Sequence, residues 1–134
     1  MLEQSELDEL WQRRKLQTIR LMEIADLTRQ LLRALDRRDE MSVQIILSMR
    51  EEPVRRLFEL DESLKKHILT LPRKSAVRAR DMLNGSPPEI EEENRLCEQT
   101  AQYRKLLEST VALDRQANIR LGGKRSFYNM FRES

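Results

Sequence analysis

Residues that form turns are scarce in this chain, and this scarcity limits the possible folds more than any other feature. Three glycines and four prolines are spread over 134 residues. A β-sandwich or barrel needs a turn signal about every 8–12 residues, so an all-β fold is excluded. Charged residues make up 36% of the chain and aromatic residues 4%. Leucine, isoleucine and valine recur regularly among them, and this combination predicts an all-α protein.

Apolar residues follow helical spacing in three long segments and one short one. We expect these helices at about residues 5–35, 40–71, 75–83 and 88–121. Asp39 can cap the second helix after a charged break. Pro88 and the glutamates behind it mark the start of the last one. The prediction is an elongated antiparallel bundle of three long helices with a short connecting helix.

Two domain-level expectations follow from this pattern. Residues 1–121 should form the helical bundle, and residues 122–134 a C-terminal tail. Leu57 and Leu107 lie on the apolar stripes, so both are expected in the core. Pro53 lies inside the second helix, where it removes a backbone hydrogen bond and costs about 3 kcal/mol. Either a kink near Pro53 or a helix restart with Pro53 in its first turn is expected.

Residue types that carry catalysis or bind metals are few. His67 is the only histidine and Cys97 the only cysteine, and they fall on different predicted helices. One cysteine makes neither an internal disulfide nor a cysteine-rich zinc site. The three glycines do not form a phosphate-binding loop. We therefore expect no enzyme activity, no cofactor and no metal.

One enzyme class remains an alternative. Residues 31–50 faintly resemble the first helix of the all-helical chorismate mutases, which bind a dianionic substrate through arginine and lysine between long helices. That resemblance implies buried arginines. Each arginine of this chain fits an exposed or rim position, so the sequence does not favour this alternative.

The charges are nearly balanced, with 25 basic and 23 acidic residues. Because the two signs are interleaved, nucleic-acid binding is disfavoured. A basic cluster consists of Arg73, Lys74, Arg78 and Arg80, and an acidic run of Glu91, Glu92 and Glu93. We interpret the first as a solvated loop facing the second, and the glutamates as solvated charges that complement a helix N-terminus. Binding of phosphate or an acidic partner is the alternative for the basic cluster.

Membrane insertion and secretion are not indicated. No apolar run approaches the roughly 18 residues that a membrane span needs. The first residues, Met1 to Glu6, are polar and acidic, unlike a secretory signal. The expectation is a soluble, cytoplasmic protein with no membrane span.

The C-terminal tail differs from the rest of the chain. Phe127, Tyr128, Met130 and Phe131 follow the pair Gly122-Gly123. Tails seldom keep so many large apolar groups, because exposed apolar patches promote aggregation. Three roles stay open: the tail caps the bundle, binds a partner, or occupies a groove until a partner displaces it.

The central third of the chain resembles a known family. A leucine pair at 31–32 is followed by the charged turn 36–39, an amphipathic helix with Arg50-Glu51, and further leucines at 57 and 60. This pattern is similar to the first helical hairpin of flagellar export chaperones of the FlgN and FliT kind. The resemblance implies a cytosolic chaperone that binds a helical segment of a hook-associated or filament-cap protein. Binding keeps that substrate soluble before type III secretion.

The resemblance also implies where the substrate binds. In this family the last helix and the C-terminal segment commonly carry or regulate binding. On this chain that maps to Val111, Leu113, Ala117, Leu121, Phe127, Tyr128, Met130 and Phe131. The alternative is a structural coiled-coil or oligomerising adaptor protein, such as a homodimer, with no role in export. An apolar face left exposed on the monomer favours the chaperone, whereas a face buried in a two-fold interface favours the alternative.

Overall fold

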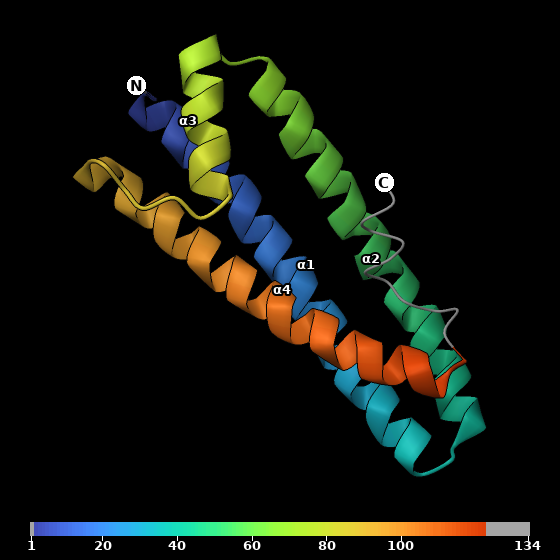
Figure 1. The fold of residues 1–134 in the computed structure, drawn as a ribbon. Coiled ribbons are helices and arrows are strands. Elements are labelled where there is room, and N and C mark those ends of the chain that lie inside the picture. The colour runs from blue at the N-terminus through green and yellow to red at the C-terminus, as the bar shows by residue number, and fades with distance from the viewer. Residues whose placement is uncertain (1, 123–134) are drawn as a thin grey trace. The chain divides into compact units, whose positions relative to one another are not determined.

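The computed structural model describes residues 2–122, and these residues are all-helical (Figure 1). Helix accounts for 86% of them, and the described part contains no strand. The elements are α1 (Gln4–Asp36), α2 (Glu40–Leu69), α3 (Arg73–Leu83), a 3-10 helix η1 (Glu91–Glu93) and α4 (Asn94–Arg120). The all-α prediction, with three long helices and one short one, is confirmed.

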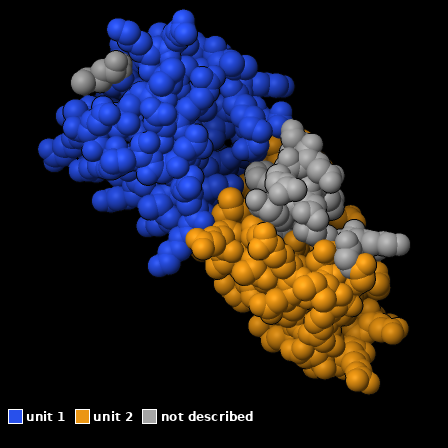
Figure 2. Space-filling model, in the orientation of Figure 1, with its two compact units in different colours: residues 1–19, 59–105 blue, residues 20–58, 106–134 orange. Residues whose placement is uncertain are grey.

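The chain divides into two compact units (Figure 2). Unit 1 consists of residues 1–19 and 59–105, and unit 2 of residues 20–58 and those from 106 onward. Each of the three long helices contributes one part to each unit.

The turn between α1 and α2 forms where the sequence predicts a break. Arg38 adopts a left-handed conformation with φ of 55°, and the Asp39 N–H donates to the carbonyl of Ala34 at 3.0 Å. Asp39 then caps α2, because its carboxylate accepts the Ser42 N–H at 3.1 Å and the Ser42 hydroxyl at 2.6 Å. These bonds lower the pKa of Asp39. The predicted cap is confirmed.

Pro53 lies inside α2, which runs unbroken from Glu40 to Leu69. Of the two expected outcomes, a restart of the helix is therefore not what the structure contains. Pro53 is buried. The free energy gained by removing its apolar ring from water partly offsets the cost of the missing backbone hydrogen bond. α2 ends two residues earlier than expected, ahead of Pro72.

Unit 1 has an apolar core contributed by all four α-helices. It comprises Leu2, Leu7, Leu10, Leu64, Ile68, Ala76, Ala79, Met82, Leu83 and Leu96. Four of these residues come from α3, whose buried face is made mainly of small and flexible side chains. α3 therefore packs closely in this unit.

The start of α4 differs from the prediction, and Glu93 is the reason. The helix begins at Asn94 rather than near Pro88, and the glutamates form η1 ahead of it. Glu93 is only 3% exposed. Its carboxylate accepts bonds from Arg78 on α3, at 2.6 and 3.1 Å, and from the Glu89 N–H at 2.9 Å. The prediction of a solvated charge is wrong for Glu93, because a tertiary ion pair holds it inside unit 1.

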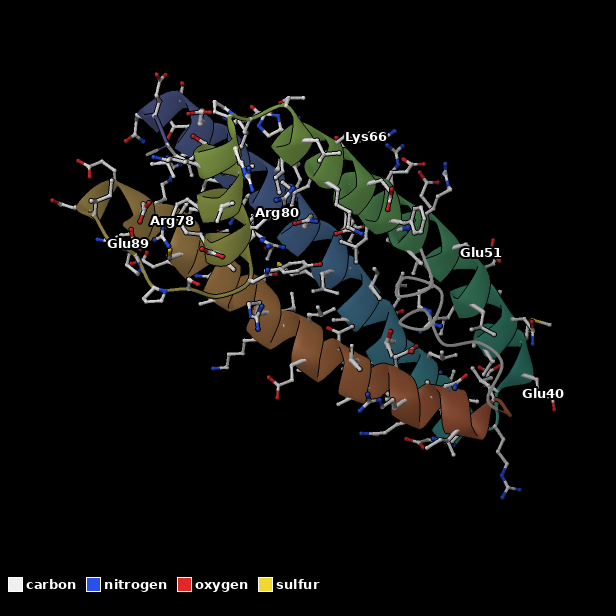
Figure 3. The ribbon with its side chains drawn as sticks, turned by 45° about the horizontal axis from the view of Figure 1, so that its top comes forward. Glu40, Glu51, Lys66, Arg78, Arg80 and Glu89 are labelled. Carbon is white, nitrogen blue, oxygen red and sulfur yellow. The ribbon has the colours of Figure 1, made fainter. Side chains whose placement is uncertain are left out.

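Arg78 accounts for part of the predicted basic cluster. Besides Glu93, it donates to the carbonyl of Pro87 at 3.0 Å and lies 3.5 Å from the Glu89 carboxylate (Figure 3). These contacts raise the pKa of Arg78 and lower that of Glu93, chiefly through their mutual hydrogen bonds. The basic cluster does face the acidic run, through Arg78, but the cluster belongs to α3 rather than to a loop, and Arg78 is half-buried rather than solvated. This contact ties α3, the loop after it and the start of α4 together.

Unit 2 has its own apolar core near the α1–α2 turn. It consists of Leu27, Leu31, Ala34, Val43, Ile46, Leu47 and Ala117, with Leu32, Leu35 and Leu121 packed against it. Leu57 is fully buried, as expected, whereas Leu107 is only half-buried. The expectation of a core position is therefore wrong for Leu107.

Candidate functional site

Three large apolar side chains lie exposed along one face of α2. Met41 is 75% exposed, and Ile45 and Met49 are each 53% exposed. They stand four residues apart, so they follow one line along the helix. We call these three residues the apolar row. All three belong to unit 2.

The same stretch of α2 also supplies the core of unit 2. Val43, Ile46 and Leu47 are buried there, so the apolar surface of this helix is wider than its own core uses. A helix that is apolar on more than one side packs against more than one neighbour. Among the described residues, no neighbour buries the apolar row, and its three side chains stay exposed.

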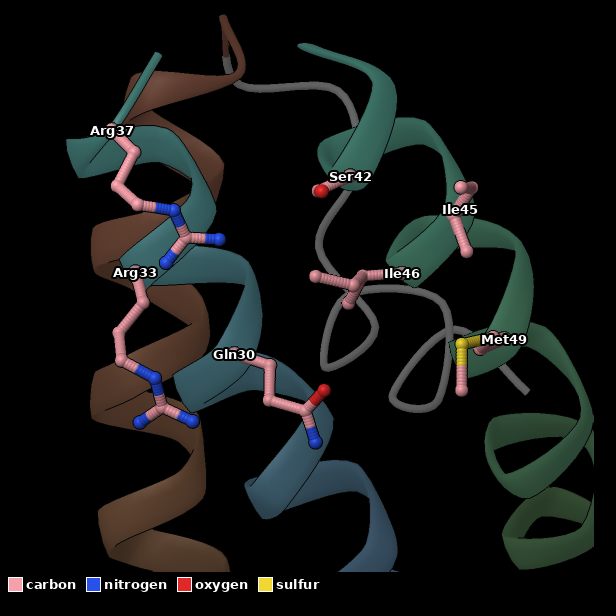
Figure 4. A pocket seen from close by; sticks show the side chains of 7 residues that line it. All are labelled: Gln30, Arg33, Arg37, Ser42, Ile45, Ile46 and Met49. Atoms are coloured by element: carbon pink, nitrogen blue, oxygen red, sulfur yellow. The ribbon is translucent and has the colours of Figure 1, made fainter. Parts of the chain in front are cut away.

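An open pocket of about 420 Å³ lies beside the apolar row (Figure 4). α1 provides one wall and α2 the other, and both walls belong to unit 2. The lining residues are Gln30, Arg33 and Arg37 from α1, and Ser42, Ile45, Ile46 and Met49 from α2. The pocket therefore has a polar, basic wall opposite an apolar wall. Its volume lies within the range of about 300–1,000 Å³ that is usual for binding pockets.

The basic wall continues as a row along α1. Arg29, Arg33 and Arg37 are exposed and, like the apolar row, stand four residues apart. We call these three residues the basic row. Within residues 2–122, neither Arg29 nor Arg33 forms an ion pair, and Arg37 reaches only Asp39, at 4.0 Å. The three positive charges of the basic row therefore share one long ion-pair contact among the described residues.

The two residues considered for nucleophilic catalysis are not placed for it. Cys97 on α4 is half-buried, and its Sγ lies 3.6 Å from the carbonyl oxygen of Ser86. Burial raises the pKa of its thiol, so the thiolate is disfavoured. His67 lies on α2, and its Nε2 atom is buried without a hydrogen-bond partner in the described structure. No contact between the two side chains is present among the described residues.

Two arginines are buried, although each arginine was expected at an exposed or rim position. In unit 2, Arg50 donates to Asp114 at 2.9 Å and to Thr28 at 3.2 Å. The guanidinium is thereby neutralised inside the core. The expectation that every arginine lies on the surface or a rim is wrong.

In unit 1, Arg14 is buried in a different setting. Its Nη1 donates to Gln17 and its Nη2 to the carbonyl of Leu83, both at 2.9 Å. Its guanidinium lies 4.5 Å from the ring centroid of Tyr103. Burial lowers the pKa of Arg14 and raises that of Tyr103 to about 12. In neither unit does the described structure bury a second arginine or a lysine beside the first.

The sequence-predicted binding residues fall into three groups. Val111 and Ala117 are buried in unit 2, so their side chains are not accessible surface. Leu113 and Leu121 are half-buried. The predicted residues Phe127, Tyr128, Met130 and Phe131 lie outside the described residues.

The apolar row was not among the predicted binding residues. The structure leaves all three of its side chains exposed. The spacing of Met41, Ile45 and Met49 could have identified the row, because its phase differs from that of Val43 and Leu47. The basic row could have been identified in the same way, because Arg29, Arg33 and Arg37 also stand four residues apart on α1.

Two further classes of site are absent from residues 2–122. They contain no group of three or more histidine, cysteine or acidic side chains that could hold a metal ion. None of their helices combines the length and apolar character needed to cross a bilayer.

The site thus consists of an apolar row on α2 and a basic row on α1, each of which contributes two residues to the lining of one pocket. No known protein family, curated protein or solved structure matches the chain.

Proposed function

We propose that the protein is a helix-binding chaperone. In this proposal it is a cytosolic export chaperone that binds a helical segment of a flagellar hook-associated or filament-cap protein and keeps it soluble before type III secretion. The observation that carries the proposal is the exposed apolar row beside an open pocket in unit 2. The resemblance of residues 31–64 to the FlgN and FliT kind adds the export role.

The physical basis is helix-in-groove recognition. An amphipathic helix presents apolar residues at intervals of three and four, and it can lay them along a row of the same pitch. Burial of apolar surface contributes about 25 cal/mol per Å². Covering the three exposed side chains of the apolar row therefore contributes favourable free energy to binding. Methionines suit this role because their flexible side chains adapt to different partners.

The proposal includes the arrangement of the helices and the remaining predicted residues. The three long helices would form an elongated antiparallel bundle, with α2 presenting the apolar row. Leu113, Leu121 and the tail residues Phe127, Tyr128, Met130 and Phe131 would extend the binding surface. Support for the tail residues comes from their composition and from the family resemblance.

Calorimetric titration with synthetic peptides tests this function. The peptides should span the terminal helices of hook-associated and filament-cap proteins. We expect at least one to bind, and the variant Ile45→Glu to weaken that binding at least tenfold, because it places a charge in the apolar row. Leu69→Glu is the matched control, since Leu69 is an exposed apolar residue of α2 that belongs to unit 1. Binding of no such peptide, or binding unaffected by Ile45→Glu, would contradict the proposal.

The structural alternative makes an opposite prediction for the same surface. A homodimer would cover the apolar row with a second copy of the chain and would need an interface of at least about 1,000 Å². Sedimentation equilibrium distinguishes the two. A stable dimer that Ile45→Glu converts to a monomer would favour the structural protein over the chaperone.

A further inference from the structure

We infer that the helix bound at this site carries a line of carboxylates along one edge of its apolar face. This inference rests on the proposed function and adds the chemistry of the partner. The apolar row would cover the partner's apolar face, and the basic row would pair with the acidic edge.

The charge of the basic row carries the first step. Arg29 and Arg33 form no ion pair within residues 2–122, and Arg37 has only the 4.0 Å contact with Asp39. Elsewhere in unit 2 the cationic side chain of Arg120 is engaged, with Nη1 at 2.5 Å from the Asp36 carboxylate. Three like charges in a line repel one another, so a line of opposite charges laid along them lowers the free energy. Arginine also binds carboxylates through two parallel N–H groups, which makes the pairing directional.

The spacing carries the second step. Residues four apart on a helix are separated by about 6 Å along its axis. Both rows follow this spacing, and two residues of each row, Arg33 and Arg37 on α1 and Ile45 and Met49 on α2, line the pocket (Figure 4). A partner helix with acidic residues four apart on one edge has the same repeat. It can therefore meet Arg29, Arg33 and Arg37 in register while its apolar face covers Ile45 and Met49.

Other occupants match these features less well. The C-terminal tail has suitable apolar residues, but Lys124, Arg125 and Arg132 outnumber Glu133, so it would add positive charge to a basic wall. A nucleic acid could neutralise the arginines but would leave the methionines and isoleucine of the opposite wall without an apolar partner. An anionic membrane offers both chemistries, but it is a broad surface, whereas the pocket has two walls.

Two designed helical peptides test the inference. Both carry the same apolar face, one has glutamates four apart along its edge, and the other has lysines there. We expect the acidic peptide to bind at least tenfold more tightly at low salt, with a difference that shrinks as salt rises. The variant Arg33→Glu should reduce or reverse this preference. Lys66→Glu should leave it unchanged, because it makes the same charge change at an exposed site of unit 1 (Figure 3).

Equal binding of both peptides, lost with Ile45→Glu, would overturn the acidic edge and leave the proposed function standing. Binding of neither peptide would contradict both proposals for this site. Vesicles of anionic lipid that bind through Arg33, while the peptides do not, would replace the helix by a membrane. Peptide binding that appears only after removal of residues 124–134 would make the tail the normal occupant and overturn the inference.

Discussion

At the scale of single residues, the ion pair of Arg78 and Glu93 is the contact with the clearest energetic consequence. Glu93 is buried, and Arg78 binds both of its carboxylate oxygens. Removing one partner of a buried charged hydrogen bond leaves the other desolvated and unpaired. The contact also determines where α4 starts.

We predict that Arg78→Ala lowers the free energy of unfolding by about 1.5–3 kcal/mol at neutral pH, the usual range for a hydrogen bond to a charged group. Chemical denaturation measures this. Arg80→Ala is the control, because Arg80 is an exposed arginine of the same helix. A loss no larger in Arg78→Ala than in the control would contradict the role of the pair.

The same pair makes stability depend on pH. Arg78 lowers the pKa of Glu93 in the folded state below its ordinary value of 4.5. The stabilisation is therefore fully present above the unfolded pKa and is lost as pH falls through the lowered one. We expect the stability difference between wild type and Arg78→Ala to shrink below about pH 4.5. A difference that stays constant down to pH 2 would argue against this ion pair.

The Asp39 cap is a second residue-level feature with a testable effect. Its carboxylate binds the backbone N–H and the hydroxyl of Ser42. Asp39→Ala should lower the thermal midpoint, because the first N–H groups of α2 lose an acceptor. Asp39→Asn keeps a side-chain oxygen and should retain most of the midpoint. Equal midpoints for wild type and Asp39→Ala would show that water replaces the cap without cost.

At the scale of the elements, local signals predicted the helices and tertiary contacts decided the exceptions. Asp39 marked the start of α2 because a cap acts within one turn. The start of α4 was missed by six residues, since it depends on Arg78 of another helix binding Glu93. The burial of Arg14 and Arg50 depends on tertiary contacts in the same way. Arg14 donates to the backbone carbonyl of Leu83 on α3, and Arg50 donates to the carboxylate of Asp114 on α4.

The candidate site was missed because the binding residues were predicted on the last helix and the tail, and no role was assigned to Met41 or Ile45. Periodicity identifies an apolar face but does not say whether a neighbour covers it. Met41, Ile45 and Met49 belong to a face that is out of phase with Val43 and Leu47. Only the structure shows which of the two faces is buried.

The two leucines predicted to be core residues should now differ in their energetic contribution. Leu57→Ala should cost about 2–5 kcal/mol, the usual range for a fully buried leucine. Leu107→Ala should cost about 1 kcal/mol, because its side chain is already partly in water. Denaturant unfolding of both variants measures the difference. Equal losses would mean that the registers of α2 and α4 differ from those described.

At the scale of the whole molecule, the two units have different characters. Unit 1 contains α3 and the pair of Arg78 and Glu93, which connects three consecutive segments. Unit 2 contains the α1–α2 turn, an apolar cluster of seven buried residues near it and the two exposed rows. Each unit is assembled from separate stretches of sequence. The proposed binding site therefore lies in one unit, on elements that the other unit also uses.

The methyl groups of the methionines measure the central claim most directly. Met41 and Met49 lie in the apolar row, whereas Met82 is fully buried in unit 1. In protein labelled with ¹³C at its methionine methyl groups, titration with the acidic-edged peptide should shift the NMR signals of Met41 and Met49. The Met82 signal should stay in place, and Ile45→Glu should abolish the shifts. Peptide binding that leaves the signals of Met41 and Met49 unmoved would contradict the claim that the apolar row is the binding site.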